Sequence, residues 1–136
     1  MNKKLKDLKK IKIKSFIEES GLLNIVEEDT TIPFKIKRVF FVTGNKGKKR
    51  GNHAHKKCYQ FFLCLNNSIE IKCNDGHNIK NIKLKSNNIG LLVPPKIWST
   101  QIYNNSNSIL AVFCNMKYNE NEYIRNYSQF LEYIKK

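Results

Sequence analysis

The sequence predicts an all-β protein, folded as a closed antiparallel barrel or sandwich with a single C-terminal helix. Three observations support this fold class. Short runs rich in β-branched and aromatic residues recur at near-regular spacing, turn-forming residues divide them, and only the last segment has helical spacing. A chain of 136 residues with no internal repeat can build one hydrophobic core, so we expect one domain.

The first half of the chain contains three expected strands and one long loop. The alternating run IKIKSFI (11–17) predicts a strand, and LLNIVEE (22–28) follows it after a Ser-Gly turn. FKIKRVFFVT (34–43) is rich in β-branched and aromatic residues. The glycine-rich, basic segment GNKGKKRGN (44–52) is expected to be a loop that is long enough to carry function.

The second half continues with strands until the final helix. CYQFFLCLN (58–66) and SIEIKC (68–73) predict a hairpin. NDGHN (74–78) contains an Asp-Gly pair, which favours a tight turn, so NIKNIKLK (78–85) is expected to pair back. Further strands are expected at residues 90–95, 98–103 and 108–116.

The segment NENEYIRNYSQFLEYIKK (119–136) predicts the one helix. Its aromatic and apolar side chains recur at intervals of three and four residues, at Tyr123, Tyr127, Phe130 and Ile134. Either Asn119 or Asn121 would cap its N-terminus, and the terminal lysines suit the negative end of the helix dipole.

The net charge of +14 attracts phosphates, whether in nucleic acid, in a nucleotide substrate or on an anionic membrane. Residues 1–14 hold seven lysines and one aspartate, and KGKKR (46–50) is a second basic cluster. Solubility alone also explains a lysine- and asparagine-rich composition, so charge selects no partner. We divide the chain into a basic N-terminal segment or strand (1–14) and a single domain (15–136).

The sequence contains no run near the ~18 apolar residues of a membrane span, and its basic N-terminus lacks the apolar core of a secretory signal. Four cysteines that form no CxxC pair are expected to be buried free thiols: Cys58, Cys64, Cys73 and Cys114. Free thiols persist in a reducing compartment, so we expect a cytoplasmic protein.

The stretch RGNHAHKK (50–57) places two of the three histidines one residue apart. In a strand, His53 and His55 point to the same face and would aim into one space. This arrangement is typical of a metal site or of an acid/base pair. Two satisfied core histidines are the purely structural alternative.

A small barrel with an early HxH pair resembles the cupins, in which a glutamate follows the pair and another histidine follows a Gly…Pro segment. Here Gln60 stands at the glutamate position, and no histidine follows Pro94 and Pro95. A divalent ion needs three or four protein ligands, so we expect no metal. Imidazoles with a pKa of about 6.5 suit proton transfer near neutral pH, which favours an acid/base pair.

Four segments resemble the nucleotide-sugar 3,4-ketoisomerases, the WxcM-like sugar 3,4-oxoisomerases of the cupin superfamily. They are IPFKIKRVFF, RGNHAHKK with its downstream glutamine, GLLVPPKIW and YNENEYIRNYSQF, in that order. The resemblance covers about residues 15 to 130. It implies a small cupin-type antiparallel β-barrel (jelly roll) and an isomerase that moves the carbonyl of dTDP-4-keto-6-deoxyglucose from C4 to C3 through an enediolate.

The resemblance also implies the cofactor needs, the pathway and the partners of this enzyme. It needs no metal and no cofactor, and its product feeds an aminotransferase that makes 3-amino-3,6-dideoxy sugars for surface glycans such as O-antigen lipopolysaccharide. Members are homodimers that exchange an N-terminal strand, with neither nucleic acid nor membrane as partner. Gly21 resembles the galacto-forming members, so we expect the galacto product.

The resemblance implies that His53 and His55 are the catalytic pair. Arg50 directly precedes them, where its guanidinium could bind the diphosphate through two hydrogen bonds. Further substrate contacts are expected at Arg38, Gln60, Trp98, Lys96 and Phe41. Phe41 replaces a tyrosine of many members, so a phenol at that position cannot take part in a proton relay.

Other functions stay open at this point. A basic barrel can grip single-stranded nucleic acid by stacking bases on exposed aromatic side chains, but the aromatics here lie within strands such as VFF and FFL. A sugar-nucleotide 3,5-epimerase also uses base-assisted enolisation, although the HAH pair differs from the epimerase His/Tyr arrangement. A catalytically silent homologue is the third alternative.

Overall fold

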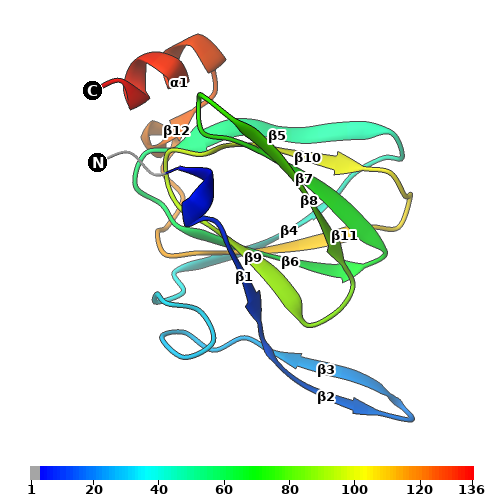
Figure 1. The fold of residues 1–136 in the computed structure, drawn as a ribbon. Helices are drawn as coiled ribbons and strands as arrows, with labels where there is room; N and C mark the ends of the chain where they lie inside the picture. Colours follow the sequence, from blue (N-terminus) through cyan, green and yellow to red (C-terminus); the bar gives the residue numbers. More distant parts are fainter. Residues whose placement is uncertain (1–3) are drawn as a thin grey trace.

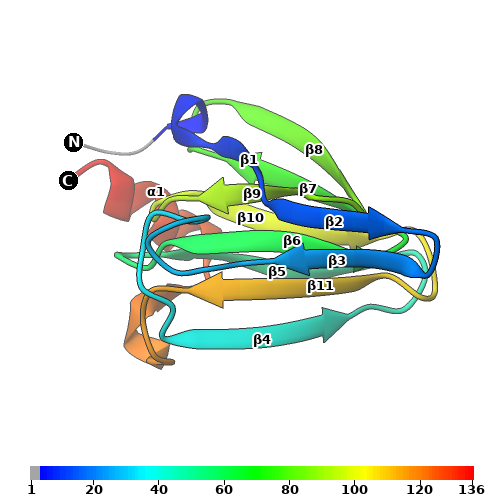
Figure 2. The same ribbon diagram turned by 90° about the horizontal axis from the view of Figure 1, so that it is seen from below.

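The computed structural model describes residues 4–136 and consists mainly of two five-stranded antiparallel sheets that pack face to face (Figures 1 and 2). One sheet has the order β1-β9-β6-β11-β4 and the other β12-β5-β10-β7-β8. The strands are β1 Lys9–Lys12, β2 Lys14–Glu18, β3 Gly21–Ile25, β4 Arg38–Thr43, β5 Lys48–His55, β6 Gln60–Asn66, β7 Ser68–Asn74, β8 Ile79–Lys85, β9 Ile89–Val93, β10 Trp98–Tyr103, β11 Ile109–Cys114 and β12 Tyr123–Ile124. The all-β, jelly-roll prediction is confirmed, but the two sheets stay separate and form a sandwich, not a closed barrel.

The core lies between the two sheets because alternate side chains of their strands face inward. Its largest cluster includes the fully buried side chains of Phe62, Ile71, Leu91, Tyr103 and Val112. The intervening residues of the β1-containing sheet face the other way. There Phe61, Leu63, Leu92 and Ala111 form a second cluster with Ile32 and Phe34 of the segment before β4, which covers this outer face.

The strand expected at residues 11–17 is two strands in the structure. β1 pairs with β9, whereas β2 pairs only with β3, and the buried Ile13 lies between β1 and β2. The resulting β2–β3 hairpin extends away from the sandwich at the bottom of Figure 1. Of the basic segment expected at 1–14, residues 1–3 lie outside the described part, and the 3-10 helix η1 (Leu5–Asp7) precedes β1.

The basic segment 44–52 is mostly strand, not the loop that its glycines suggest. β5 begins at Lys48 and pairs with β10, with Tyr103 opposite Lys48. Gly51 and Asn52 have positive φ angles of 88° and 59°, and the β5–β10 register shifts beside them, as in a β-bulge. Pairing with a strand about fifty residues away therefore overrides the local turn signals.

The C-terminal helix is shorter than its periodicity predicts. α1 spans Tyr127–Ile134, and Asn126 caps it by accepting a hydrogen bond from the Gln129 amide. Before it, the 3-10 helix η2 (Glu120–Glu122), capped by Asn119, leads into β12, which pairs with β5. The predicted start and both predicted caps of a helix over 119–136 are therefore wrong, because residues 123–124 are drawn into the sheet. None of the helices within residues 4–136 has the length and apolarity to cross a membrane.

Candidate functional site

A cavity of about 160 Å³ opens between the sheets at the end where β12 joins β5. It is lined by Phe40, Val42, Arg50, Gly51, His53, Gln60, Phe62, Gln101, Tyr123 and Arg125. These residues come mainly from β4, β5, β6, β10 and β12, so the cavity depends on both sheets. Its lining combines apolar side chains with imidazole, amide, phenol and guanidinium groups, a composition typical of a site for a polar small molecule.

The two histidines of β5 face the same side of the strand, as their spacing predicts. Their ring centroids are 5.2 Å apart and their planes are nearly perpendicular, at 88°. The intervening Ala54 is fully buried on the opposite side, against Phe130 and Ile134 of α1. His53 lines the cavity, while His55 lies behind it and is 5% exposed.

Both imidazoles are held in the neutral form. Burial lowers the pKa of His55 to about 3, and the charges of His53, Arg38 and Arg125 act in the same direction. Burial is also the largest cause that lowers the pKa of His53. Nδ1 of His53 and both ring nitrogens of His55 are buried without a hydrogen-bond partner in residues 4–136. Neutral, unpaired ring nitrogens beside a cavity are groups that can accept and return protons.

Acid should therefore destabilise the fold through these histidines. The unfolded chain binds protons at its histidines below about pH 6.5, whereas the folded chain does not protonate His55 until about pH 3. The free energy of unfolding should fall as the pH drops through this window. We expect urea titrations at pH 7.5 and pH 5 to show that the free energy of unfolding falls less between the two pH values for His55→Asn than for the unchanged chain. The exposed His77 offers a control, since His77→Asn should keep the full loss; an equal loss in all three proteins would contradict this explanation.

Tyr123 is a cavity-lining residue that the sequence interpretation missed. It pairs with His55 across β12 and β5, and its ring centroid lies 5.0 Å from that of His53 and 4.4 Å from that of His55. Its hydroxyl accepts a hydrogen bond from Arg38 Nη1 at 3.3 Å. The guanidinium of Arg125 stacks over its ring at 4.3 Å. The sequence interpretation assigned Tyr123 to the C-terminal helix, because it fits the three- and four-residue spacing of that helix, and therefore did not place it beside the histidines.

Two glutamates hold the segment that carries Tyr123. The Glu122 carboxylate is buried, and one of its oxygens accepts the backbone N–H groups of Lys57 and Cys58, both at 2.7 Å. Glu120 is exposed and forms a two-point ion pair with Arg125, at 2.7 and 2.9 Å. The first anchors β12 beside β5, and the second fixes the guanidinium that stacks on Tyr123.

Three of the expected contact residues lie at or next to the cavity. Arg50 and Gln60 line it, and the Gln60 side chain is buried and points inward as predicted. Arg38 lies one layer behind Tyr123, where its guanidinium reaches the Tyr123 hydroxyl and the Cys114 sulfur. It is therefore placed to support the lining residues.

The other three expected contact residues lie elsewhere. Phe41 is 67% exposed on the outward face of β4, because strand alternation turns Phe40 toward the cavity instead. Trp98 packs against the rings of Tyr127 and Phe130 and so anchors α1. Lys96 has a positive φ of 66° and lies over the Tyr133 ring. The structure thus does not bring these three to the cavity.

The third histidine, His77, lies away from the cavity and forms no metal site with the other two. His77 lies in the turn between β7 and β8, where its backbone N–H donates to Asp75. No group of three or more His, Cys, Asp or Glu side chains among residues 4–136 could hold a metal ion together. The expectation of a metal-free site stays a prediction.

Comparison with known proteins gives consistent matches over nearly the whole chain. The family model described as FdtA, WxcM-like, C-terminal matches residues 1–135. The chain is 40% identical over 129 residues, 94% of its length, to TDP-4-oxo-6-deoxy-alpha-D-glucose-3,4-oxoisomerase of Aneurinibacillus thermoaerophilus, 93% of which is covered.

Solved structures agree with that match. A histidine-to-asparagine mutant of the 3,4-ketoisomerase QdtA from Thermoanaerobacterium thermosaccharolyticum, in complex with TDP-4-keto-6-deoxyglucose, is similar with a TM-score of 0.93 and 33% identity, covering 97% of this chain and 96% of QdtA. A 3,4-ketoisomerase from Helicobacter canadensis gives a TM-score of 0.91 and 36% identity over 96% and 98% of the two chains.

Proposed function

Since this chain belongs to the FdtA family of WxcM-like C-terminal proteins, we propose that it is a TDP-sugar 3,4-ketoisomerase. The proposed substrate is TDP-4-keto-6-deoxyglucose, whose carbonyl moves from C4 to C3. The observation that carries the proposal is the pair of adjacent neutral imidazoles, with His53 lining a polar cavity and His55 behind it, in a chain so similar to a named oxoisomerase.

The reaction follows from the chemistry of these groups. The proton on C3 is acidic because C3 lies next to the C4 ketone, and its removal gives an enediolate. We assign this step to His53, which lines the cavity, and the return of a proton to C4 to the same imidazole. His55 would relay a proton between the two oxygens. The isomerisation has no net oxidation or reduction, so it needs neither a redox cofactor nor, with two bases present, a metal.

Charged groups around the histidines suit a nucleotide sugar. Arg50 and Arg125 both line the cavity, and a guanidinium can bind a diphosphate through two parallel hydrogen bonds. Gln60 and Gln101 can hydrogen-bond sugar hydroxyls without ionising.

We propose that the product has the galacto configuration at C4, because Gly21 resembles the galacto-forming members, and that an aminotransferase acts next on it. A nucleotide-sugar substrate and four free thiols favour the cytoplasm.

Conversion of the substrate tests this function. Purified protein is incubated with TDP-4-keto-6-deoxyglucose, and the sugar is followed by NMR. A 3-keto-6-deoxy sugar is expected, and the configuration at C4 reports whether the product is galacto or gluco. Inversion at C3 or C5 with the ketone left at C4 would identify an epimerase instead.

Tyr123→Phe should slow this reaction without unfolding the protein. The variant keeps the ring beside both histidines but removes the hydroxyl that accepts from Arg38. Loss of one hydrogen bond to a charged group, worth about 1.5 kcal/mol, corresponds to roughly a tenfold lower kcat. Steady-state kinetics should show this drop, while Tyr133→Phe, on α1, should match the unchanged enzyme. Equal kcat values for Tyr123→Phe and the unchanged enzyme would exclude a role for the hydroxyl.

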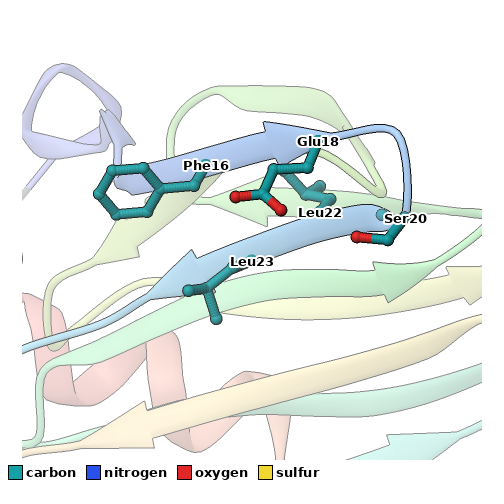
Figure 3. A pocket seen from close by; sticks show the side chains of 6 residues that line it. Phe16, Glu18, Ser20, Leu22 and Leu23 are labelled. Atoms are coloured by element: carbon teal, nitrogen blue, oxygen red, sulfur yellow. The ribbon is translucent and has the colours of Figure 1, made fainter.

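The β2–β3 hairpin is the segment that we propose to be exchanged in a homodimer. A two-stranded hairpin is marginally stable alone, and this one exposes Phe16, Ile17, Leu22 and Leu23. Figure 3 shows Phe16, Leu22 and Leu23 along a shallow pocket on the hairpin. A second copy of the chain could cover these apolar groups.

The dimer can be tested by sedimentation. The unchanged protein should sediment as a dimer, and Leu23→Asp should dissociate it, because a charge would then be buried in the interface. Ile79→Asp is a matched control on β8, where the side chain is similarly exposed (57% for Ile79 and Leu23). A monomer at all concentrations, or a dimer that tolerates Leu23→Asp, would contradict the exchange of this hairpin.

A further inference from the structure

Two glutamines line the cavity, and a neighbouring side chain already binds one end of each amide. Gln60 lies on β6 and Gln101 on β10, and both side chains are buried. A glutamine amide has an oxygen that accepts hydrogen bonds and an NH2 group that donates them. The neighbours of each amide therefore decide which of these two groups faces a ligand.

Tyr103 orients the amide of Gln101. The two residues lie two positions apart on one face of β10, and the Tyr103 hydroxyl donates to Gln101 Oε1 at 2.7 Å. Tyr103 is fully buried, and burial raises the pKa of its phenol, so the hydroxyl keeps the proton that it donates. With Oε1 bound in this way, the NH2 group is the end of Gln101 that is left for the cavity.

Two glycines leave room for this arrangement. A Cβ at Gly44 would collide with the Tyr103 ring, so glycine lets the ring lie where its hydroxyl reaches Gln101. Gly51 lines the cavity, and a Cβ placed there would be 3.6 Å from Gln101 Nε2. The NH2 end of Gln101 thus lies beside a residue of the cavity wall, as the hydrogen bond from Tyr103 requires.

Gln60 has the opposite orientation. Its Nε2 donates to the Cys114 sulfur at 3.5 Å, and Arg38 Nη2 donates to the same sulfur at 3.5 Å. A guanidinium has donors only, so the sulfur acts as an acceptor at this point. The NH2 group of Gln60 is therefore engaged behind the cavity, and its Oε1 is left for a ligand.

We propose that the two amides bind the two reacting oxygens of the sugar with opposite polarity. Gln101 donates an N–H to the ketone oxygen on C4, and Gln60 accepts the hydroxyl proton of C3. Tyr103 is a positioning residue that acts through Gln101. This assignment rests on the proposed ketoisomerase function and deepens it, because it names the groups that hold the reacting oxygens.

The N–H of Gln101 stabilises the charge that develops during the reaction. When His53 removes the C3 proton, the electron pair forms the C3–C4 double bond and the C4 oxygen becomes negative. A fixed donor at that oxygen binds the enediolate more strongly than the neutral ketone, so it lowers the barrier. The amide itself loses no proton and stays neutral throughout.

The same substitution at the two glutamines tests their polarity. An ionised glutamate has the shape of glutamine but only accepts, so Gln101→Glu loses the N–H, whereas Gln60→Glu still presents an acceptor to the cavity. We expect kcat to fall by about 10²-fold or more in Gln101→Glu, the loss typical of one oxyanion donor, and by a clearly smaller factor in Gln60→Glu. Equal losses, or a larger loss in Gln60→Glu, would overturn the proposal. Gln101→Met, which adds no charge, should lose as much as Gln101→Glu, and a Met variant with unchanged kcat would also overturn it.

Tyr103→Phe tests the positioning role, because it removes only the hydroxyl that holds Gln101. We expect kcat to fall by about tenfold, while the Kd for TDP, measured by calorimetry, stays within about twofold because TDP has no sugar. Tyr127→Phe is the matched control: its hydroxyl accepts from Asn74 away from the cavity, so kcat should be unchanged. An unchanged kcat in folded Tyr103→Phe, or TDP binding weakened as much as kcat, would overturn this role.

Urea denaturation tests the hydrogen bond between Tyr103 and Gln101 without any turnover. In a double-mutant cycle of Tyr103→Phe and Gln101→Met, the losses in free energy of unfolding should not add, because both changes remove the same bond. Additive losses would overturn the fixed orientation of Gln101. If the unchanged protein converts no sugar, the proposed function fails together with the assignment of the two oxygens, and the cycle still decides whether Tyr103 orients Gln101.

Discussion

Replacing His53 with asparagine is expected to lower the kcat for carbonyl migration by about 10²- to 10⁴-fold, the contribution typical of a positioned acid/base group. His53 is the imidazole that lines the cavity, and we assign to it both proton transfers at carbon. Asparagine keeps a polar side chain of similar length but cannot accept a proton near neutral pH. The KM should change much less than kcat, because the diphosphate contacts assigned to Arg50 and Arg125 are left in place.

His55→Asn should cause a comparable loss, since the two histidines act on one substrate, and the double variant should be little worse than either single one. The exposed His77 on the β7–β8 turn supplies the control, and His77→Asn should retain full activity. Circular dichroism and sedimentation would show that the variants keep the fold. Activity within threefold of the unchanged enzyme in a folded His53→Asn protein would contradict the assigned role.

Glu122→Ala is expected to be the most destabilising change near the site. The buried carboxylate accepts two backbone N–H groups at 2.7 Å, and hydrogen bonds to charged groups contribute about 1.5–3 kcal/mol each. Alanine leaves the amides of Lys57 and Cys58 buried without an acceptor, so we expect a free energy of unfolding lower by about 3 kcal/mol or more. Urea denaturation measures this loss.

Glu122→Gln is the matched comparison, because its amide oxygen can still accept from the same N–H groups without the charge. The free energy of unfolding should fall clearly less for Glu122→Gln than for Glu122→Ala. The alanine variant should also lower kcat in its folded fraction, because Glu122 precedes Tyr123 and anchors β12 against β5. Equal stability of the two variants would mean that the carboxylate does not hold this segment.

The sequence predicted the elements whose side-chain pattern is local. The HAH spacing placed both histidines on one face of a strand, because alternation depends only on the backbone of that strand. The same reasoning predicted the inward Gln60, and the turn signal at Asp75 and Gly76 predicted the hairpin between β7 and β8, whose loop spans four residues, 75–78. The hairpin expected between residues 58–66 and 68–73 is wrong, because β6 and β7 lie in different sheets.

Features that depend on pairing with distant strands could not be predicted in this way. Residues 48–52 contain the turn-forming pair Gly51–Asn52 yet extend β5, because β10 supplies hydrogen-bond partners. Tyr123 fits a helical repeat yet joins the sheet beside His55, since Glu122 ties this segment to the chain before β6. The tyrosine that completes the site was therefore hidden inside an expected helix.

Three of the residues expected as substrate contacts do not line the cavity. Phe41 was expected to line the site, but Phe40 has the inward position on β4. Trp98 begins β10, the strand that pairs with β5, and Lys96 lies just before it. Both side chains contact α1, whose packing surface could not be predicted before the helix was located. Position along a strand decides which neighbouring residue reaches the cavity.

The most direct test of the central claim is conversion of TDP-4-keto-6-deoxyglucose by the purified protein in deuterium oxide, followed by NMR of the sugar ring. The proposed reaction predicts a 3-keto product that carries deuterium at C4 and no deuterium at C5. In His53→Asn, both the 3-keto product and the deuterium at C4 should be absent. Exchange at C3 and C5 with the ketone retained at C4 would contradict the claim and identify epimerase chemistry. A folded protein that neither converts the sugar nor exchanges its protons would contradict catalysis by the histidine pair altogether.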